Sequence, residues 1–241
     1  PYLGTNVMTM DVRHLLTWVA ALALVYVLIA YVVLPLVWRR FERRHPLLAD
    51  IPGITHTGSG IPGDPLNVAL IGNEAEVKAA FAAAKWLPAD PLSLRADIAI
   101  AVDTVRKRSD PEAPVSNLYL WGRKEDLAFE QQMDGNPRER HHVRFWKAEK
   151  TADDGRPVWV GSGTFDLRVG FSDRTGQFTH HIARDIDAER DHIFQTLQQA
   201  GVLANVETVA NFHTVREGRN GGGDPWVTDG ALSLGTIRPG A

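Results

Sequence analysis

The feature that most constrains this chain is an uncharged apolar stretch at residues 15–37, LLTWVAALALVYVLIAYVVLPLV. As a helix, its 23 residues at about 1.5 Å each reach roughly 34 Å, enough to cross a hydrocarbon core of ~30 Å. Trp18 and Trp38 bracket the stretch, as expected for an aromatic belt at the membrane interfaces. We therefore predict a single transmembrane helix over residues 14–38, preceded by a tail of residues 1–13.

A cleaved signal peptide is the competing interpretation of this stretch. Signal peptides have a shorter apolar run, a basic leader and a small-residue cleavage site. Here the run is long and ends in Trp38-Arg39-Arg40, which favours a retained span. Residues 39–44 (RRFERR) are rich in arginine, whereas only Arg13 precedes the span. Because positive residues stay on the cytoplasmic side, we expect the large domain to be cytoplasmic and the first dozen residues to lie outside.

Two tyrosines of the span and the net charge of the chain indicate which kinds of partner to expect. Tyr26 lies near the middle of the span and Tyr31 nearer its end; a tyrosine hydroxyl in lipid prefers a polar partner. Tyr26 therefore either tilts toward an interface or contacts another transmembrane protein, and both alternatives stay open. We expect membrane lipids and other transmembrane proteins as partners. The net charge of −3 gives no basic field for nucleic acid, and the absence of cysteine excludes thiol chemistry and cysteine-ligated metals.

The remaining residues predict a basic juxtamembrane segment and Pro/Gly-rich linker at 39–64, followed by one α+β domain at 65–241. Asn73 with Glu76 forms a capping box for one helix, and Asp90-Pro91 starts a second. Asp187 is predicted to open a third helix that ends near Gly201. Strands in a run between helices indicate a mainly antiparallel sheet. The predicted strands are 67–71, 117–121, 127–131, 140–146, 158–165, 167–170, 177–182, 206–215 and 231–237.

Two histidine pairs, His141-His142 and His180-His181, fall inside predicted strands. Neighbouring residues of a strand face opposite sides, so each pair has one core-facing imidazole, His141 or His180, and one polar-facing imidazole. Three interpretations remain open. The histidines are structural; or His141 and His180 bind a metal together with a carboxylate such as Asp166 or Asp187; or a polar face binds an anion through arginine forks. The residues of that face are Arg140, His142, Arg144, Arg168 and His181.

A glycine-rich segment, GRNGGGDPWVTDG at residues 218–230, is the second candidate for a binding site. Glycines let the backbone approach a ligand closely, and exposed amides bind anions. Its polar members Asn220, Asp224 and Asp229 could orient a ligand or a metal, or merely stabilise turns. No lysine follows, so the segment is not a nucleotide-binding fingerprint. The acidic residues Glu125, Asp126 and Glu130 are expected at the solvated surface, and the sequence requires no cofactor.

Several blocks resemble one family when taken together and in order. They are DPLNVALIG, WLPADPLSLR, APVSNLYLWGRKEDLAFEQ, NPRERHHVRFW, GRPVWVGSGTFD, THHIARDIDAERD and GRNGGGDPWVTDG, and they run from about Asp64 to Gly230. They look like the LssY C-terminal-domain family of bacteria, whose activity is uncharacterised. That domain often follows multi-spanning regions similar to DedA proteins and type-2 phosphatidic acid phosphatases. This chain has one predicted span and no phosphatase motif, so the resemblance implies membrane association and a shared histidine, arginine and glycine-loop site, but no lipid phosphatase activity.

Two functions follow as hypotheses. The first is a single-span accessory or binding subunit of a larger membrane complex, of a respiratory or photosynthetic type, because no complete catalytic set is evident. The second is a membrane-anchored enzyme, metal-dependent or not, that acts on phosphorylated or lipid-derived substrates through the histidine, arginine and aspartate residues.

Overall fold

The computed structural model describes residues 12–34, 45–89, 117–133, 136–172 and 178–240. The chain divides into two compact units, Pro1–Arg43 and Arg44–Ala241, and each is described by itself. The predicted second helix after Asp90 lies outside the described residues, as do Trp38, Arg39 and Arg40.

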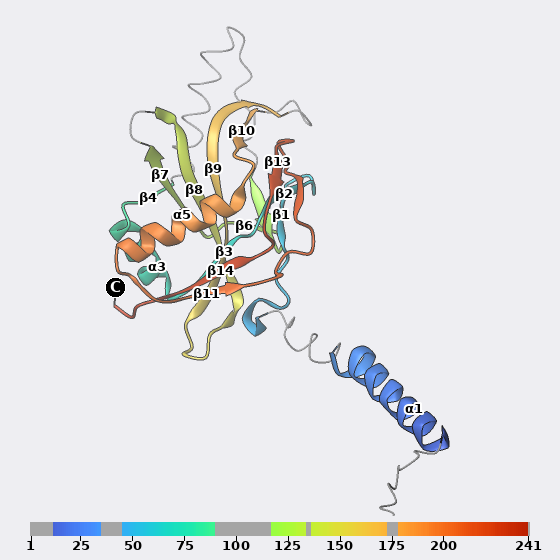
Figure 1. Cartoon of the computed structure of the whole chain (residues 1–241). Coiled ribbons are helices and arrows are strands. Elements are labelled where there is room, and N and C mark those ends of the chain that lie inside the picture. Colours follow the sequence, from blue (N-terminus) through green and yellow to red (C-terminus); the bar gives the residue numbers. More distant parts are fainter. Residues whose placement is uncertain (1–11, 35–44, 90–116, 134–135, 173–177, 241) are drawn as a thin grey trace, which may run out of the picture. The chain divides into compact units, whose positions relative to one another are not determined.

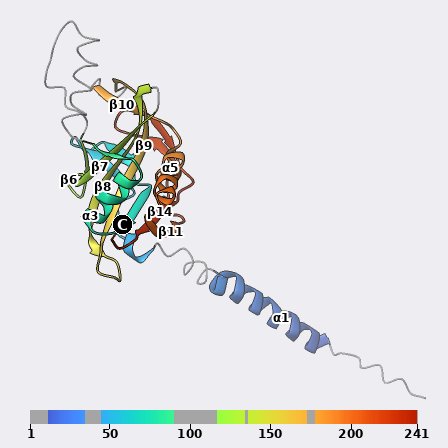
Figure 2. The same ribbon diagram turned by 90° about the vertical axis from the view of Figure 1, so that its left-hand side faces the viewer.

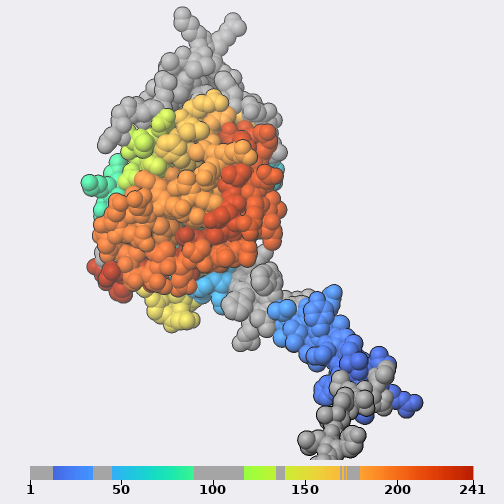
Figure 3. Space-filling view, viewed as in Figure 1, coloured from blue at the N-terminus to red at the C-terminus, as the bar shows by residue number. Residues whose placement is uncertain are grey.

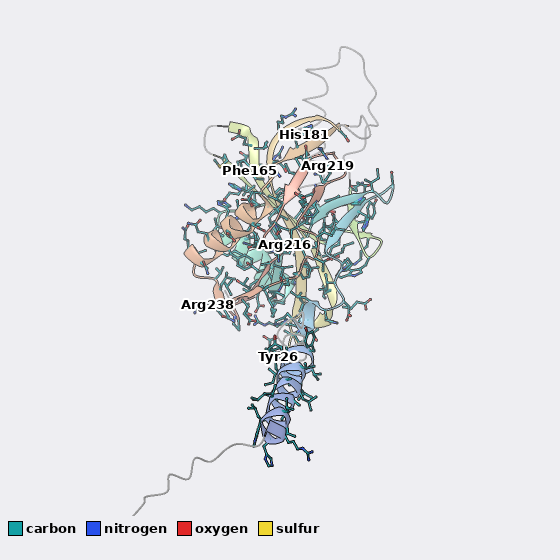
Figure 4. The ribbon with its side chains drawn as sticks, turned by 45° about the vertical axis from the view of Figure 1, so that its right-hand side comes forward. Tyr26, Phe165, His181, Arg216, Arg219 and Arg238 are labelled. Atoms are coloured by element: carbon teal, nitrogen blue, oxygen red, sulfur yellow. The ribbon has the colours of Figure 1, made fainter. Side chains whose placement is uncertain are left out.

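The described residues of the first unit, 12–34, form one helix. It consists of α1 (Val12–Leu28) and a continuing π-helical turn, η1 (Ile29–Val33). Residues Arg13–Val33 have a mean hydropathy of 2.4, so this helix is long and apolar enough to cross a membrane. Its large apolar side chains are exposed, and Tyr26 is 69% exposed. Figure 4 shows Tyr26 on this helix. An apolar surface of this length is stable in water only when something covers it, which fits the predicted span.

The second unit is an α+β domain built on an eight-stranded, mostly antiparallel sheet (Figure 1). The strand order is β11-β14-β3-β9-β8-β7-β4, and β10 pairs with β9; only β14 and β3 run parallel. A smaller sheet has the order β2-β1-β5-β6, and β12 and β13 form a hairpin. The bounds are β1 (Ile54–Thr57), β2 (Pro62–Pro65), β3 (Val68–Ile71), β4 (Leu87–Pro88), β5 (Leu118–Leu120), β6 (Arg123–Lys124), β7 (Leu127–Met133), β8 (Asn136–Thr151), β9 (Pro157–Phe171), β10 (Phe178–Ile182), β11 (Leu203–Val209), β12 (Glu217–Arg219), β13 (Pro225–Val227) and β14 (Leu232–Ile237).

Both faces of the large sheet are covered. Helices α3 (Glu74–Ala83) and α5 (Ile186–Gln199) bury Phe81, Ile193 and their neighbours against one face, and α5 crosses the sheet in Figure 1. The opposite face packs Trp146 against residues of β5 and of the short 3-10 helix η2 (Pro46–Leu48). In the turned view, β6 and α5 lie on opposite sides of β8 and β9 (Figure 2). Residues in the middle of this sheet, such as Val143 and Trp146, are therefore buried on either face.

One buried amide ties these layers together. The Asn67 side chain donates to the carbonyl oxygens of Gly163 (3.0 Å) and Ile186 (2.8 Å), and its own oxygen accepts from the amide of Gly163 (2.8 Å). Asn67 is fully buried, so all three hydrogen bonds lie out of water. They fix the start of α5 against β9, and α5 with the segments after it makes up much of the surface seen in Figure 3.

Local signals predicted several elements correctly. Asn73 and Glu76 form the predicted capping box of α3, with reciprocal distances of 2.8 Å. The α+β class and the mainly antiparallel sheet are confirmed. The third helix begins one residue earlier than predicted, because the side chain of Asp185, and not that of Asp187, caps it.

Three predictions about regular structure are wrong. Residues 45–64 contain η2, β1 and β2 and are not an unstructured linker, because Leu48 and Ile51 are buried in the core. The strands predicted at 158–165 and 167–170 are one long strand, β9. The strand predicted at 206–215 ends at Val209, and Asn211 then takes a left-handed turn conformation (φ 56°).

Candidate functional site

The candidate site begins with the pairing of β8 and β9. Arg140 lies opposite Asp166, His142 opposite Thr164, and Arg144 opposite Ser162. Alternate residues of a strand share a face, so these six side chains lie on one face. They lie on the face away from α5, next to the glycine-rich hairpin.

A polar cavity of about 50 Å³ lies over this face. On the same volume scale, a cavity that holds one water molecule measures roughly 10–15 Å³, so this cavity has room for a small polar group. Its walls come from β1, β2, β5, β8, β9, β10 and the loop of the β12–β13 hairpin. The lining residues are Thr57, Gly63, Asp64, Leu118, His142, Arg144, Thr164, Asp166, His180, Ile182, Asn220, Gly221 and Gly222.

Asp166 is held as a carboxylate at the floor of the cavity. Its Oδ2 lies 2.8 Å from Nδ1 of His180, and its Oδ1 accepts a long hydrogen bond from Thr164 (3.4 Å). Burial acts to raise the pKa of Asp166, but the hydrogen bond and charge of His180 outweigh burial and keep that pKa below its usual range. Asp166 and His180 thus form a carboxylate–imidazole pair.

Asp64 is the second carboxyl group of the cavity, and its pKa is shifted in the opposite direction to that of Asp166. Burial raises the pKa of Asp64, and the charge of Arg144 and a hydrogen bond from Asn220 only partly oppose this effect. Asn220 Nδ2 donates to Asp64 Oδ1 at 3.0 Å. Two carboxyl groups whose pKa values are pushed in opposite directions therefore line one cavity.

The glycine-rich hairpin is attached to this site by side chains. Asn220 accepts from the amide of Asp224 (2.9 Å), and Asp224 Oδ1 lies 2.7 Å from Nδ1 of His181. A Cβ added to Gly221 would come within 2.6 Å of a methyl group of Thr57, so only glycine allows this approach to β1. Figure 4 shows His181 and Arg219, from β10 and β12, toward the same end of the domain. The two segments that the sequence singled out thus meet.

His142 and Arg144 line the cavity with polar groups, the first buried and the second half-buried. His142 is 3% exposed, and its Nε2 atom is buried without a hydrogen-bond partner among the described residues. Burial and the charge of Arg144 lower the pKa of His142 to about 3, so its imidazole is neutral. Within the described part of the chain, the Arg144 guanidinium makes no hydrogen bond or ion pair either.

The structure brings together some of the predicted site residues and separates others. His142, Arg144, Asp166, His180 and Asn220 line the cavity, and His181 and Asp224 lie directly behind it. His141 faces α5 instead, where its Nδ1 lies 2.7 Å from Glu189 and its ring stacks on His192.

Asp187 and Asp229 belong to a separate ion-pair network centred on Arg190. Arg190 donates to Asp187 at 3.1 Å and to Asp229 at 3.0 Å, and Thr228 donates to Asp187 at 2.8 Å. This network joins the first turn of α5 to the segment after β13. Its contacts give it a structural role.

The assignment of faces needs two corrections. His142, predicted to face polar surroundings, is more buried than His141, because the hairpin and the small sheet cover its face. His180, and not His181, lines the cavity with His142. Of the predicted anion-binding face, Arg140 is instead paired with Glu130 (3.1 Å) and Arg168 is exposed.

The metal hypothesis required His141 and His180 to share a carboxylate ligand. The two histidines contact different carboxylates, Glu189 and Asp166. Among the described residues, no group of three histidine, aspartate or glutamate side chains is arranged to hold a metal ion. The residues that the structure describes therefore do not assemble the ligands that this hypothesis needs.

Sequence reasoning missed Asp64 and Thr164, and it was wrong about Glu130. Glu130 is 8% exposed and pairs with Arg140, so it is not at the solvated surface. Thr164 could have been found from its spacing of two residues from Asp166 on one strand. Asp64 had only one signal, its position at the start of the first block that resembles the family.

Most of the chain matches one known protein family. The family described as LssY C-terminus matches residues 48–232, which is more than half of the chain. The chain belongs to the LssY C-terminal family. No protein of curated function and no solved structure matches it. The LssY C-terminal domain includes the whole described cavity, from Thr57 to Gly222, and it starts within the segment predicted as a linker.

Proposed function

We propose that this chain is a membrane-anchored accessory module whose LssY C-terminal domain binds a small polar ligand in the cavity. The observation that carries the proposal is the buried His142 Nε2 atom, which has no hydrogen-bond partner among the described residues and lies on the cavity wall with the half-buried Arg144 guanidinium. Buried polar groups without partners cost free energy, so native proteins keep few of them outside binding sites. A ligand that bonds to both groups would offset that cost.

The helix at Arg13–Val33 supports the membrane part of the proposal. We place it in a bacterial inner membrane with the domain on the cytoplasmic side, because the arginines of residues 39–44 follow the span. In this arrangement, lipids and other transmembrane proteins cover the helix. The test is fractionation without detergent, followed by protease protection of a C-terminal tag in sealed inverted and right-side-out vesicles. Recovery of the folded chain in the aqueous fraction would refute anchoring.

An accessory role in a larger membrane complex, of respiratory or photosynthetic type, is the finer part of the proposal. It is supported by the exposed apolar surface of α1, which includes the mid-span Tyr26. Purification in mild detergent should give the chain together with stoichiometric membrane proteins, and Tyr26→Phe and Tyr26→Leu should test the hydroxyl and the ring separately. A monodisperse monomer would refute membership of a complex.

Ligand binding is tested on the purified full chain in detergent. Thermal denaturation is measured against a panel of small anionic, neutral and cationic metabolites. We expect members of one class to stabilise the wild type but not Arg144→Gln. The matched control is Arg168→Gln, which removes an exposed arginine of the same sheet. If no compound stabilises the wild type, or if both variants respond alike, the cavity is not the binding site.

A second candidate function, an enzyme acting on phosphorylated or lipid-derived substrates, is favoured by one observation. Asp64 and Asp166 line the same cavity with their pKa values shifted in opposite directions, which is the arrangement of a general acid beside a general base. A phosphoesterase screen of the wild type and of Asp166→Asn tests it. Absence of turnover in the wild type, or equal turnover in the variant, would remove this candidate.

A further inference from the structure

Among the residues that the structure describes, most charges around the cavity are matched in ion pairs, and that of Arg144 is not. Arg140 is paired with Glu130, Asp166 with His180, and Asp224 with His181. Each pair is formed by side chains of different strands or of the hairpin, so the fold itself holds the pairs together. The Arg144 guanidinium is the cavity-lining cation for which the described residues provide no such partner.

Asp64 and Asp166 are the acidic groups of the cavity wall whose charges act on Arg144, and of these Asp166 is already paired with His180. Three charged residues act on Asp64: Arg144 on β8, Asp166 on β9 and Asp224 in the hairpin. Asn220 donates a hydrogen bond to its Oδ1 atom. Burial raises the pKa of this carboxyl, because desolvation penalises its charged form. When Asp64 is protonated, its carboxyl group can donate a hydrogen bond from the cavity wall.

These groups together define the chemistry of a ligand. An arginine fork with no partner among the described residues matches the paired oxygens of phosphate or carboxylate. The neutral imidazole of His142 and a protonated Asp64 carboxyl are two further donors on the same walls. A volume of about 50 Å³ suits one tetrahedral or planar oxyanion, either free or as the end of a larger molecule that leaves through the opening.

We propose that the cavity binds a small oxyanion between the guanidinium of Arg144 and the imidazole of His142, and that the anion binds together with a proton on Asp64. This inference rests on the proposed ligand-binding function and deepens it by naming the ligand class and its coupling to pH. As pH rises and Asp64 ionises, its carboxylate pairs electrostatically with Arg144 and repels the anion, so binding weakens. Replacement of Asp64 by asparagine mimics the uncharged carboxyl and removes this loss.

The experiment measures anion affinity by isothermal titration with the full chain in detergent at about pH 6 and about pH 8.5. Sulfate is the first probe, because its own charge does not change in this range, and inorganic phosphate is the second. We expect the affinity of the wild type for sulfate to fall by on the order of tenfold or more between the two pH values, which is the effect of one nearby charge. All other groups are the same in both proteins, so the smaller fall expected for Asp64→Asn isolates the contribution of Asp64.

Variants at Arg144, Arg168 and Asp64 distinguish the possible results. Arg144→Gln should lose most sulfate affinity at both pH values, whereas Arg168→Gln should keep it; unchanged melting temperatures show that the variants are folded. Wild-type affinity for sulfate and phosphate that is indifferent to Arg144→Gln would overturn the inference. So would stabilisation only by neutral or cationic metabolites, although the proposed binding function would then stand. Equal pH dependence in the wild type and Asp64→Asn would refute the coupling to a proton.

The same assay identifies the source of the oxyanion. Short-chain phosphatidic acid below its micelle concentration is titrated into the wild type and Arg144→Gln. Tighter binding than inorganic phosphate, lost in Arg144→Gln, would support a lipid headgroup as the ligand. Binding no tighter than that of phosphate would support a free oxyanion. Phosphatidic acid affinity that survives Arg144→Gln while phosphate fails to bind would place lipid recognition outside the cavity and overturn the inference.

Discussion

Replacing His142 by glutamine should make the domain less sensitive to acid. The folded state holds this imidazole neutral, with its pKa lowered from 6.5 to about 3 by burial and by the charge of Arg144. In the unfolded chain the imidazole takes up a proton below about pH 6.5, so the unfolded state binds more protons and gains free energy as the pH falls. Stability is therefore unaffected above that value and declines by about 1.4 kcal/mol per pH unit below it. At about pH 5 the expected loss from His142 alone is roughly 2 kcal/mol.

The assay is urea unfolding of the full chain in detergent at about pH 7.5 and about pH 5, for the wild type and His142→Gln. Other groups titrate in both proteins, so the difference between their pH profiles reports His142. The exposed His56→Gln, on β1, is the control for loss of an imidazole. If the wild type and His142→Gln lose the same stability within about 0.5 kcal/mol, the neutral buried state of His142 is refuted.

Three further substitutions test the packing that holds the site. Asn67→Ala removes three buried hydrogen bonds and should destabilise the domain by about 3 kcal/mol or more in urea unfolding, whereas the exposed Asn205→Ala should cost under about 0.5 kcal/mol. Gly161→Ala would place a Cβ 2.7 Å from a phenyl ring and 2.8 Å from a backbone oxygen, so its melting temperature should fall by several degrees, at a cost of about 1–3 kcal/mol; an unchanged value would contradict the close strand packing. Arg140→Met leaves the buried Glu130 carboxylate without its arginine and should cost about 3–5 kcal/mol at neutral pH, while the double variant Arg140→Met/Glu130→Gln should recover much of this loss in the same measurement.

Local patterns predicted the elements that depend on local interactions. The capping box at Asn73 and Glu76 needs only residues three apart, and it forms as predicted. Alternation along β8 correctly placed His141 and His142 on opposite faces. It did not reveal which face is buried more deeply, because the cover over His142 comes from the hairpin at residues 217–227, some 75 residues further along the chain or more.

The segment at residues 45–64 is a second case in which local sequence patterns did not predict the structure. Its prolines and glycines are typical of a linker, yet it forms η2, β1 and β2. These strands gain their hydrogen bonds from each other and from β5, and Leu48 gains its burial from the core of the large sheet. Asp64 was overlooked as a site residue because its surroundings are supplied by this long-range packing.

The sequence by itself determined that the chain carries an uncharged apolar helix and an α+β domain of the LssY C-terminal family. Helix length, apolar continuity and strand alternation are properties of neighbouring residues, so they are visible without the fold. Only the tertiary structure decided which polar side chains meet. The pairing of β8 with β9 and the hydrogen bonds from the hairpin bring Asp64, His142, Arg144, Asp166 and Asn220 around one cavity, where burial raises the pKa of Asp64 and lowers that of His142.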